Sequence, residues 1–92
     1  MAVSIDERLR QIGVLMDVVI DDTSVPRNIR QTISDAKKRI LSKEGELDIA
    51  IANAIYMLDE VSNDINMPFH ARTDIWNAVS ELEKLKEVIK VR

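Results

Sequence analysis

The chain contains no cysteine and, among 92 residues, only two glycines and two prolines. Without cysteine it cannot form disulfides or thiolate metal sites, and it has no cysteine nucleophile. Small secreted domains usually carry disulfides, so this absence favours the cytoplasm. With so few glycines and prolines to break regular structure, the sequence favours long helices over a sandwich or barrel.

Other absences restrict the chemistry. Two glycines cannot make a glycine-rich phosphate loop, and the chain has neither a nucleotide fingerprint nor a G-x-S-x-G motif. His70 is the single histidine, and at helical spacing it pairs only with Asp74, which is too few ligands for zinc. The acids Asp59, Glu60 and Asp64 lack the Glu-x-x-His partner of a carboxylate metal site. We therefore expect no catalytic residues, no metal, no cofactor, and a protein that is not an enzyme.

Signals for secretion and for the membrane are missing too. The first residues, M-A-V-S-I-D-E-R, place acids where a signal peptide has a basic start and an apolar run. No segment approaches the roughly 20 apolar residues of a membrane span. We expect a cytoplasmic protein without a membrane partner.

Apolar residues recur at helical spacing in four segments. The first helix is expected to begin at Ser4, where S-I-D-E matches a capping box, and the second and fourth near Pro26 and Pro68. The third is expected from about residue 46 to 61, after Gly45, which can take the left-handed conformation that closes many helices. Short connections make successive helices antiparallel neighbours.

Two local features carry further expectations. Ser24 or Thr23 is expected to cap the second helix, and Asn66 the fourth. Gly13 lies inside the first helical pattern, where it weakens the helix by about 1 kcal/mol relative to alanine. It therefore indicates a close approach by a neighbouring helix.

The sequence repeats at an offset of 42 residues. The offset gives these identical pairs: Asp6/Asp48, Asp17/Asp59, Val19/Val61, Asp22/Asp64, Pro26/Pro68, Arg30/Arg72, Ile33/Ile75 and Ala36/Ala78. They predict two helical hairpins, residues 4–44 and 46–91, that form an all-α, four-helix up-and-down bundle in one domain, 1–92. The period also falls in the range of HEAT-type hairpins, about 40–47 residues, which the chain weakly resembles. A short HEAT-like pair that stacks through oligomerisation is the alternative.

Each repeat places an acid four residues before its proline and an arginine four residues after it. These are Asp22 and Arg30 in the first repeat, and Asp64 and Arg72 in the second. Each acid is expected to sit before a helix start, where the helix dipole favours negative charge. It is also expected to pair with the arginine two turns on.

Basic residues concentrate in the second helix, while residues 46–66 contain acids and neither lysine nor arginine. The candidate basic patch is Arg27, Arg30, Lys37, Lys38, Arg39 and Lys43. Such a helix could contact phosphate, although the net charge of the chain is −3 and no aromatic residue interleaves the patch. A solvated face, or contact with the acidic third helix, is the other interpretation.

The second hairpin carries aromatic residues where the first is polar. Phe69 and Trp76 lie seven residues apart and share a helical face, and their counterparts are Arg27 and Ser34. The pair either fills the edge of the core or forms an interface. The candidate interface residues are Phe69, Arg72, Thr73 and Trp76. An identical chain about a two-fold axis is the simplest cover, so a homo-oligomer, with a dimer favoured, is expected.

Two segments, T-S-V-P-R-N-I-R-Q-T-I and D-I-N-M-P-F-H-A-R-T-D-I-W-N-A-V-S-E-L-E, resemble a small archaeal family, Uncharacterised Protein Family 0147. The matching residues are 25–30, Met67, Pro68, His70, Ala71, Arg72, Thr73, Ile75, Trp76 and Asn77. The resemblance implies an archaeal, cytoplasmic, all-helical bundle, and it implies no activity.

The sequence thus favours a non-enzymatic module for protein interaction or self-assembly. The alternative is a nucleic-acid or ribonucleoprotein accessory protein that uses the basic second helix.

Overall fold

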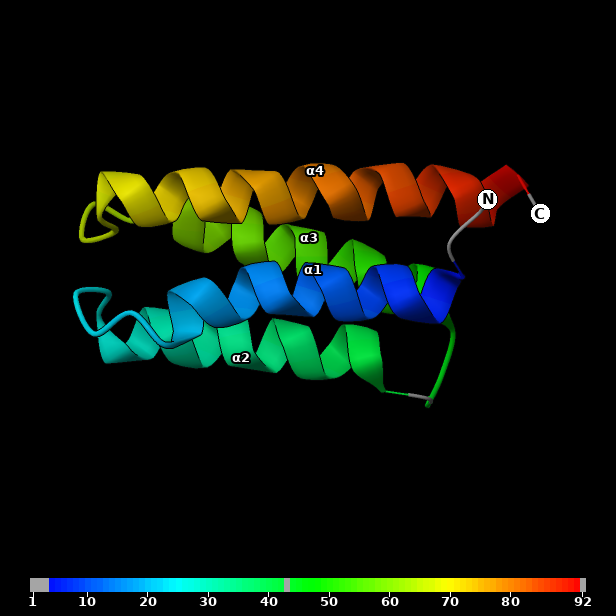
Figure 1. The fold of residues 1–92 in the computed structure, drawn as a ribbon, viewed down its shortest axis with the longest axis horizontal. Coiled ribbons are helices and arrows are strands. Elements are labelled where there is room, and N and C mark those ends of the chain that lie inside the picture. Colours follow the sequence, from blue (N-terminus) through cyan, green and yellow to red (C-terminus); the bar gives the residue numbers. More distant parts are fainter. Residues whose placement is uncertain (1–3, 43, 92) are drawn as a thin grey trace.

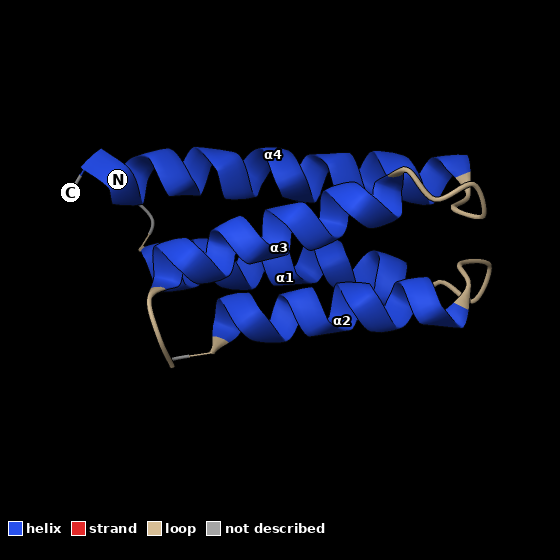
Figure 2. Cartoon of the chain, turned by 180° about the vertical axis from the view of Figure 1, so that it is seen from behind, coloured by secondary structure: helices blue, strands red, loops and turns tan. Residues whose placement is uncertain are grey.

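The computed structural model describes residues 4–42 and 44–91, without the side chains of residues 90 and 91. Its helices are α1 (Ile5–Ile20), α2 (Arg27–Leu41), α3 (Leu47–Ser62) and α4 (Phe69–Val91). Each helix packs against the next, and α1 also packs against α4, which closes the ring (Figures 1 and 2). The described residues contain no strand (Figure 2). The predicted all-α, up-and-down bundle is confirmed.

The core consists of aliphatic side chains from all four helices, from the α1–α2 turn and from the α3–α4 turn. The buried apolar residues are Leu9, Ile12, Met16, Val19, Val25, Ile29, Ile33, Ala36, Ile40, Ile51, Ala54, Leu58, Val61, Met67, Ala71, Ile75, Ala78, Leu82 and Leu85. Spacing at helical period predicts most of them, because one face of each helix turns inward. None is aromatic, so the bundle closes without Tyr56, Phe69 or Trp76.

The repeat is confirmed at the level of the backbone. The first three helix boundaries of the first hairpin, at residues 5, 20 and 27, recur 42 residues later at 47, 62 and 69. The turns match as well: Val25 N–H donates to the Asp22 carbonyl at 3.1 Å, and Met67 N–H to the Asp64 carbonyl at 3.0 Å. Both turns lie at one end of the bundle, and the α2–α3 connection lies at the other (Figure 1).

The predicted helix caps are right in one case and wrong in two. The Ser4 hydroxyl accepts the Glu7 N–H at 3.1 Å, which starts α1. At α2, Pro26 occupies the cap position and no side chain caps it, since the Ser24 hydroxyl donates to Asp22 instead. Asn66 donates its backbone N–H to the Asp64 carboxylate and makes no side-chain cap among the described residues. Each proline already fixes the backbone for a first turn, so a capping side chain is dispensable there.

Both glycines occupy places that constrain them. Gly45 has φ of 75°, the left-handed conformation expected for it. It does not close α2, however, because that helix ends at Leu41 with Ser42 extended at the cap position. Gly13 is buried against α2, and a Cβ at this position would lie 3.3 Å from Lys37 Cε. The close approach predicted at Gly13 is therefore confirmed, and the neighbour is a lysine stem.

In the described part of the chain, no helix is both long and apolar enough to cross a membrane.

Candidate interaction surfaces

The start of α4 presents a row of exposed apolar side chains. Phe69 is 74% exposed and Trp76 is 50% exposed, with exposed Thr73 between them. These three residues, four and three positions apart, form one helical face, here named the aromatic face. Ile65 in the preceding turn is 92% exposed. The surface thus offers large apolar groups that the core does not use.

Arg72, expected on this face, is held in the turn instead. It is half-buried, and its Nη2 donates to the Asp64 carbonyl at 3.3 Å and to the Met67 carbonyl at 3.4 Å. Arg30 makes a related contact in the first hairpin, where, among the described residues, its Nε donates to the Val25 carbonyl alone, at 3.0 Å. Each arginine therefore donates to the backbone of its own turn, while the buried Nε of Arg72 has no hydrogen-bond partner among the described residues.

The predicted Asp–Arg ion pairs are wrong. Asp22 Oδ1 accepts the Ser24 N–H at 2.9 Å, and Asp64 Oδ1 accepts the Asn66 N–H at 2.8 Å. Aspartate side chains commonly accept a backbone N–H two residues on, which stabilises a turn. Among the described residues, neither carboxylate forms an ion pair with an arginine.

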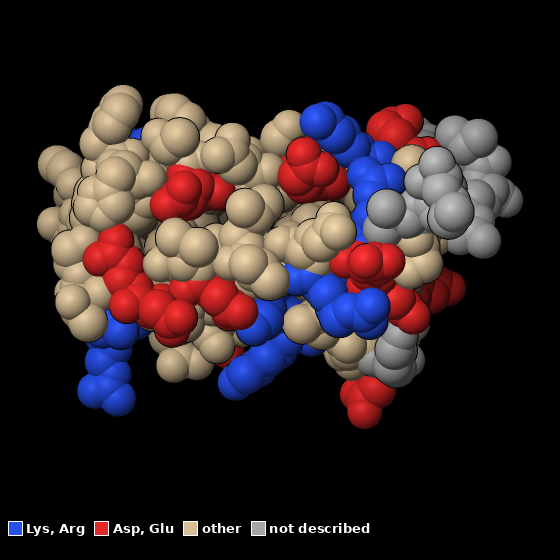
Figure 3. Space-filling model, in the orientation of Figure 1, with Lys and Arg blue, Asp and Glu red and all other residues tan. Residues whose placement is uncertain are grey.

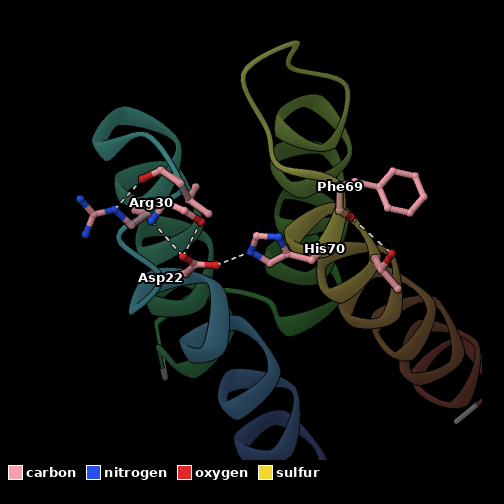
Figure 4. Close-up of polar contacts among 7 residues, drawn as sticks. Asp22, Arg30, Phe69 and His70 are labelled. Carbon is pink, nitrogen blue, oxygen red and sulfur yellow. Dashed lines mark hydrogen bonds and ion pairs between the residues drawn. The ribbon is translucent and has the colours of Figure 1, made fainter.

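The second carboxylate oxygen of Asp22 contacts the other hairpin. His70 Nε2, at the start of α4, lies 2.7 Å from Asp22 Oδ2 (Figure 4). The hydrogen bond from the Ser24 hydroxyl, assisted by His70 and the Ser24 N–H, lowers the pKa of Asp22 from 3.8 to about 2. Phe69 precedes His70 and points away from Asp22 (Figure 4). The first turn of α4 thus ties the hairpins together on one side and offers an aromatic ring on the other.

Among the described residues, no group of three or more histidine and acidic side chains lies close enough to hold a metal ion. His70, which with Asp74 offers too few ligands for zinc, contacts Asp22 of the other hairpin.

The candidate basic patch is divided. Arg27, Lys38 and Arg39 are exposed on α2. Arg30 is committed to its turn, and Lys37 Nζ lies 2.6 Å from Asp17 Oδ1 on α1. Lys43 lies outside the described residues. As expected, α2 lies beside the acidic helix α3 and packs against it. The ion pair of Lys37, however, is formed with α1.

Acidic side chains accompany the aromatic face. Glu83 and Glu87 are exposed on α4 and continue its row at helical spacing, through Ser80, beyond Trp76. Asp59 is exposed near the end of α3. On the side of the molecule that shows α1, the first half of α4 is largely uncharged, and acids gather beside it near the turns (Figure 3).

An open hollow lies between α1 and α2. It has a volume of about 480 Å³ and is lined by Asp17, Ile20, Ser34, Lys37, Lys38 and Leu41, among others. We name it the α1–α2 hollow. Two of its lining residues, Ile20 and Leu41, are aliphatic, and the lysine stems add further apolar surface.

Sequence reasoning missed three of these features. The exposure of Ile65 could have been found, because its counterpart at offset 42 is Thr23, the same exchange of polar for apolar seen at Phe69 and Trp76. The contact between His70 and Asp22 joins residues 48 apart, and no local pattern marks it. The hollow depends on packing between helices and leaves no local pattern either.

Comparison with known proteins gives a consistent result. The model of the uncharacterised protein family UPF0147 matches residues 1–85. The UPF0147 protein of Methanocaldococcus jannaschii is 48% identical over 81 residues, which cover 88% of this chain and 87% of the relative. The UPF0147 protein of Pyrococcus horikoshii is 44% identical over 84 residues, which cover 90% of each chain.

Solved structures share the fold. The crystal structure of MMP1188, a protein of unknown function, has a TM-score of 0.84 at 43% identity, over 90% of this chain and 94% of that chain. The crystal structure of a UPF0147 protein from Thermoplasma acidophilum has a TM-score of 0.81 at 37% identity, over 90% and 99%. The chain belongs to the uncharacterised protein family UPF0147.

Proposed function

We propose that the chain is a non-enzymatic, cytoplasmic interaction module that associates with a second copy of itself through the aromatic face. The observation that carries this proposal is the half-exposed Trp76. The core is already closed by aliphatic residues, so the indole is not needed to complete it.

The composition of the surface supports this function. Tryptophan is enriched among the few residues that dominate binding energy in protein interfaces, and such residues cluster in patches that exclude water. Phe69, Thr73 and Trp76 lie on one helix, so the backbone loses little conformational entropy when a partner binds. A homo-oligomer, with a dimer as its smallest form, is the simplest assembly that covers the aromatic face.

Sedimentation equilibrium of the Trp76→Ser variant tests this function. Serine is the residue at the equivalent position of the first hairpin, so the helix should tolerate it. Self-association should weaken by about 2 kcal/mol or more, as hot-spot truncations do. Val14→Ser on α1 is the control, because it removes an apolar side chain of similar exposure outside the aromatic face. A wild type that stays monomeric at high concentration contradicts the proposal.

A second candidate is an accessory protein for nucleic acid or a ribonucleoprotein. It is favoured by the exposed side chains of Arg27, Lys38 and Arg39 on a helix whose one acid is Asp35. Phosphate contacts weaken steeply with salt, whereas an apolar contact between copies hardly responds, so salt dependence separates the two functions.

A further inference from the structure

The two hairpins differ at one pair of equivalent positions, Ser34 and Trp76. Each is the eighth residue of its helix, α2 or α4, and the backbone of the two hairpins repeats at offset 42. At Ser34 the small side chain leaves the α1–α2 hollow open. At the equivalent position of the second hairpin, Trp76 projects a half-exposed indole. One hairpin therefore carries a protrusion where the other carries an opening.

These two features cannot meet within one molecule. In the ring of helices, the outer side of the α1–α2 hairpin is opposite the outer side of the α3–α4 hairpin (Figures 1 and 2). They can meet only between two copies, with the second hairpin of one facing the first hairpin of the next.

The hollow has the chemistry that suits an indole ring. Ile20 and Leu41 provide aliphatic walls, and Lys38 places a cation beside the opening, where it can lie over the ring face. A buried tryptophan needs an acceptor for its N–H. The carboxylate of Asp17, whose Oδ1 accepts from Lys37 Nζ, lines the same hollow and can accept a further hydrogen bond.

The charges around the two features are complementary. Arg27 and Lys38 are exposed on the outer side of α2, in one row with Ser34. Glu83 and Glu87 are exposed in the row that contains Trp76 on α4, and Asp59 is exposed on α3. Opposite charges that face one another fix register and speed association, whereas like charges oppose the wrong pairing.

We propose that Trp76 of one copy inserts into the α1–α2 hollow of the next copy. The proposal rests on the proposed self-association and names the surface that the aromatic face meets. The contact is head-to-tail, because the two surfaces that touch are different and lie on opposite sides of the molecule. Such a contact does not close upon itself in a dimer, so assembly continues with concentration unless a ring forms. It replaces the two-fold arrangement expected from the sequence.

Two variants test this proposal in combination. Trp76→Ser removes the protrusion and keeps the hollow, while Ser34→Trp fills the hollow and keeps the protrusion. Alone, each should lose self-association at least about 30-fold, the equivalent of about 2 kcal/mol for a hot spot. Mixed at equal concentration, they should form a one-to-one dimer that does not grow, because one copy supplies Trp76 and the other supplies the hollow. Analytical ultracentrifugation of the mixture measures this, and circular dichroism checks that each variant is helical.

The outcomes separate this proposal from the broader one. If Trp76→Ser loses association while Ser34→Trp associates like the wild type, the aromatic face is an interface but the hollow is not its partner. If the mixture remains monomeric although both variants are folded, the head-to-tail contact is refuted. A monomeric wild type refutes both proposals. If Ser34→Trp does not fold, Lys38→Glu replaces it. If that variant associates as strongly as the wild type, the proposed contact between the α1–α2 hollow and Trp76 is refuted.

Discussion

At the scale of single residues, the carboxylate of Asp22 has two tasks. One oxygen accepts hydrogen bonds from the N–H and the hydroxyl of Ser24, and the other faces His70 on α4. The first contact shapes a turn, and the second joins the two hairpins at the end opposite the α2–α3 connection (Figure 1). Asp64, its counterpart, accepts only from the Asn66 N–H among the described residues.

This arrangement predicts how stability depends on pH. Because the folded state lowers the pKa of Asp22 from 3.8 to about 2, the charged carboxylate stabilises the fold above about pH 4. That contribution is lost as the pH falls from about 4 through 2. Asp22→Asn should therefore be less stable than the wild type at neutral pH, and the difference should shrink across this window. Urea denaturation at several pH values measures it.

Asp21→Asn is the matched control for the substitution of Asp22. Asp21 is adjacent and exposed, and it accepts no hydrogen bond from Ser24 or His70. A difference between Asp22→Asn and the wild type that stays constant down to pH 2 would contradict the role assigned to the carboxylate.

Gly13 allows a second prediction at this scale. Alanine favours a helix interior over glycine by about 1 kcal/mol, but its Cβ would lie 3.3 Å from Lys37 Cε. Because that atom is near the end of a flexible side chain, Gly13→Ala should raise the free energy of unfolding by about 0.5 kcal/mol. In a Lys37→Ala background the gain should approach about 1 kcal/mol. Thermal and urea unfolding measure both, and a net loss of stability in the second background would contradict the explanation.

At the scale of elements, the two turns repeat their backbone hydrogen bonds, and each receives an arginine donor, Arg30 Nε in the first and Arg72 Nη2 in the second. Arg30 and Arg72 each reach back to carbonyl groups of the preceding turn, and the backbone of each turn repeats. Removing a donor from partly buried carbonyl groups leaves them without that partner. Arg30→Ala and Arg72→Ala should therefore each lower the free energy of unfolding by about 1–2 kcal/mol.

Comparison of these two substitutions tests the equivalence of the hairpins. Urea denaturation should give similar losses, and Arg27→Ala, an exposed arginine of the same helix, should change stability little. A large loss at one arginine and none at the other would show that the turns are alike in geometry but not in energetics.

The helices themselves could be predicted because their signals are local. Spacing at i, i+3 and i+4 identifies the buried stripes, and Ser4 caps the helix that begins at the next residue. The predicted caps at Ser24 and Asn66 failed for a physical reason. Both residues lie in turns where the aspartate two residues earlier takes their backbone N–H. Proline then starts the helix without a capping side chain.

At the scale of the whole molecule, the sequence could predict the bundle but not the contacts between hairpins. The offset of 42 residues predicts two equal units, and units joined by short connections pack side by side. The repeat predicts neither the pairing of His70 with Asp22 nor that of Lys37 with Asp17. The two aspartates recur in the other hairpin, but the counterparts of His70 and Lys37 are Asn28 and Val79. The sequence also placed Arg72 at the aromatic face. Its hydrogen bonds to the turn carbonyl groups could not be predicted, because they depend on the folded turn.

The whole-molecule charge leads to a last prediction, about nucleic acid. Of the described residues in the basic patch, only Arg27, Lys38 and Arg39 are exposed, because Arg30 donates to its turn and Lys37 pairs with Asp17. The net charge of the chain is −3. We expect no binding of single-stranded RNA at physiological salt, because nucleic-acid domains are usually net basic. Fluorescence anisotropy at decreasing salt measures this.

Three phosphate contacts would give a slope of about −2 in log affinity against log salt. Lys38→Glu with Arg39→Glu should reduce that slope to about −0.7, while Lys37 is kept because its ammonium pairs with Asp17. Tight binding by the wild type that is lost in this double variant would favour the accessory function over self-association, since it would assign the exposed face of α2 to phosphate.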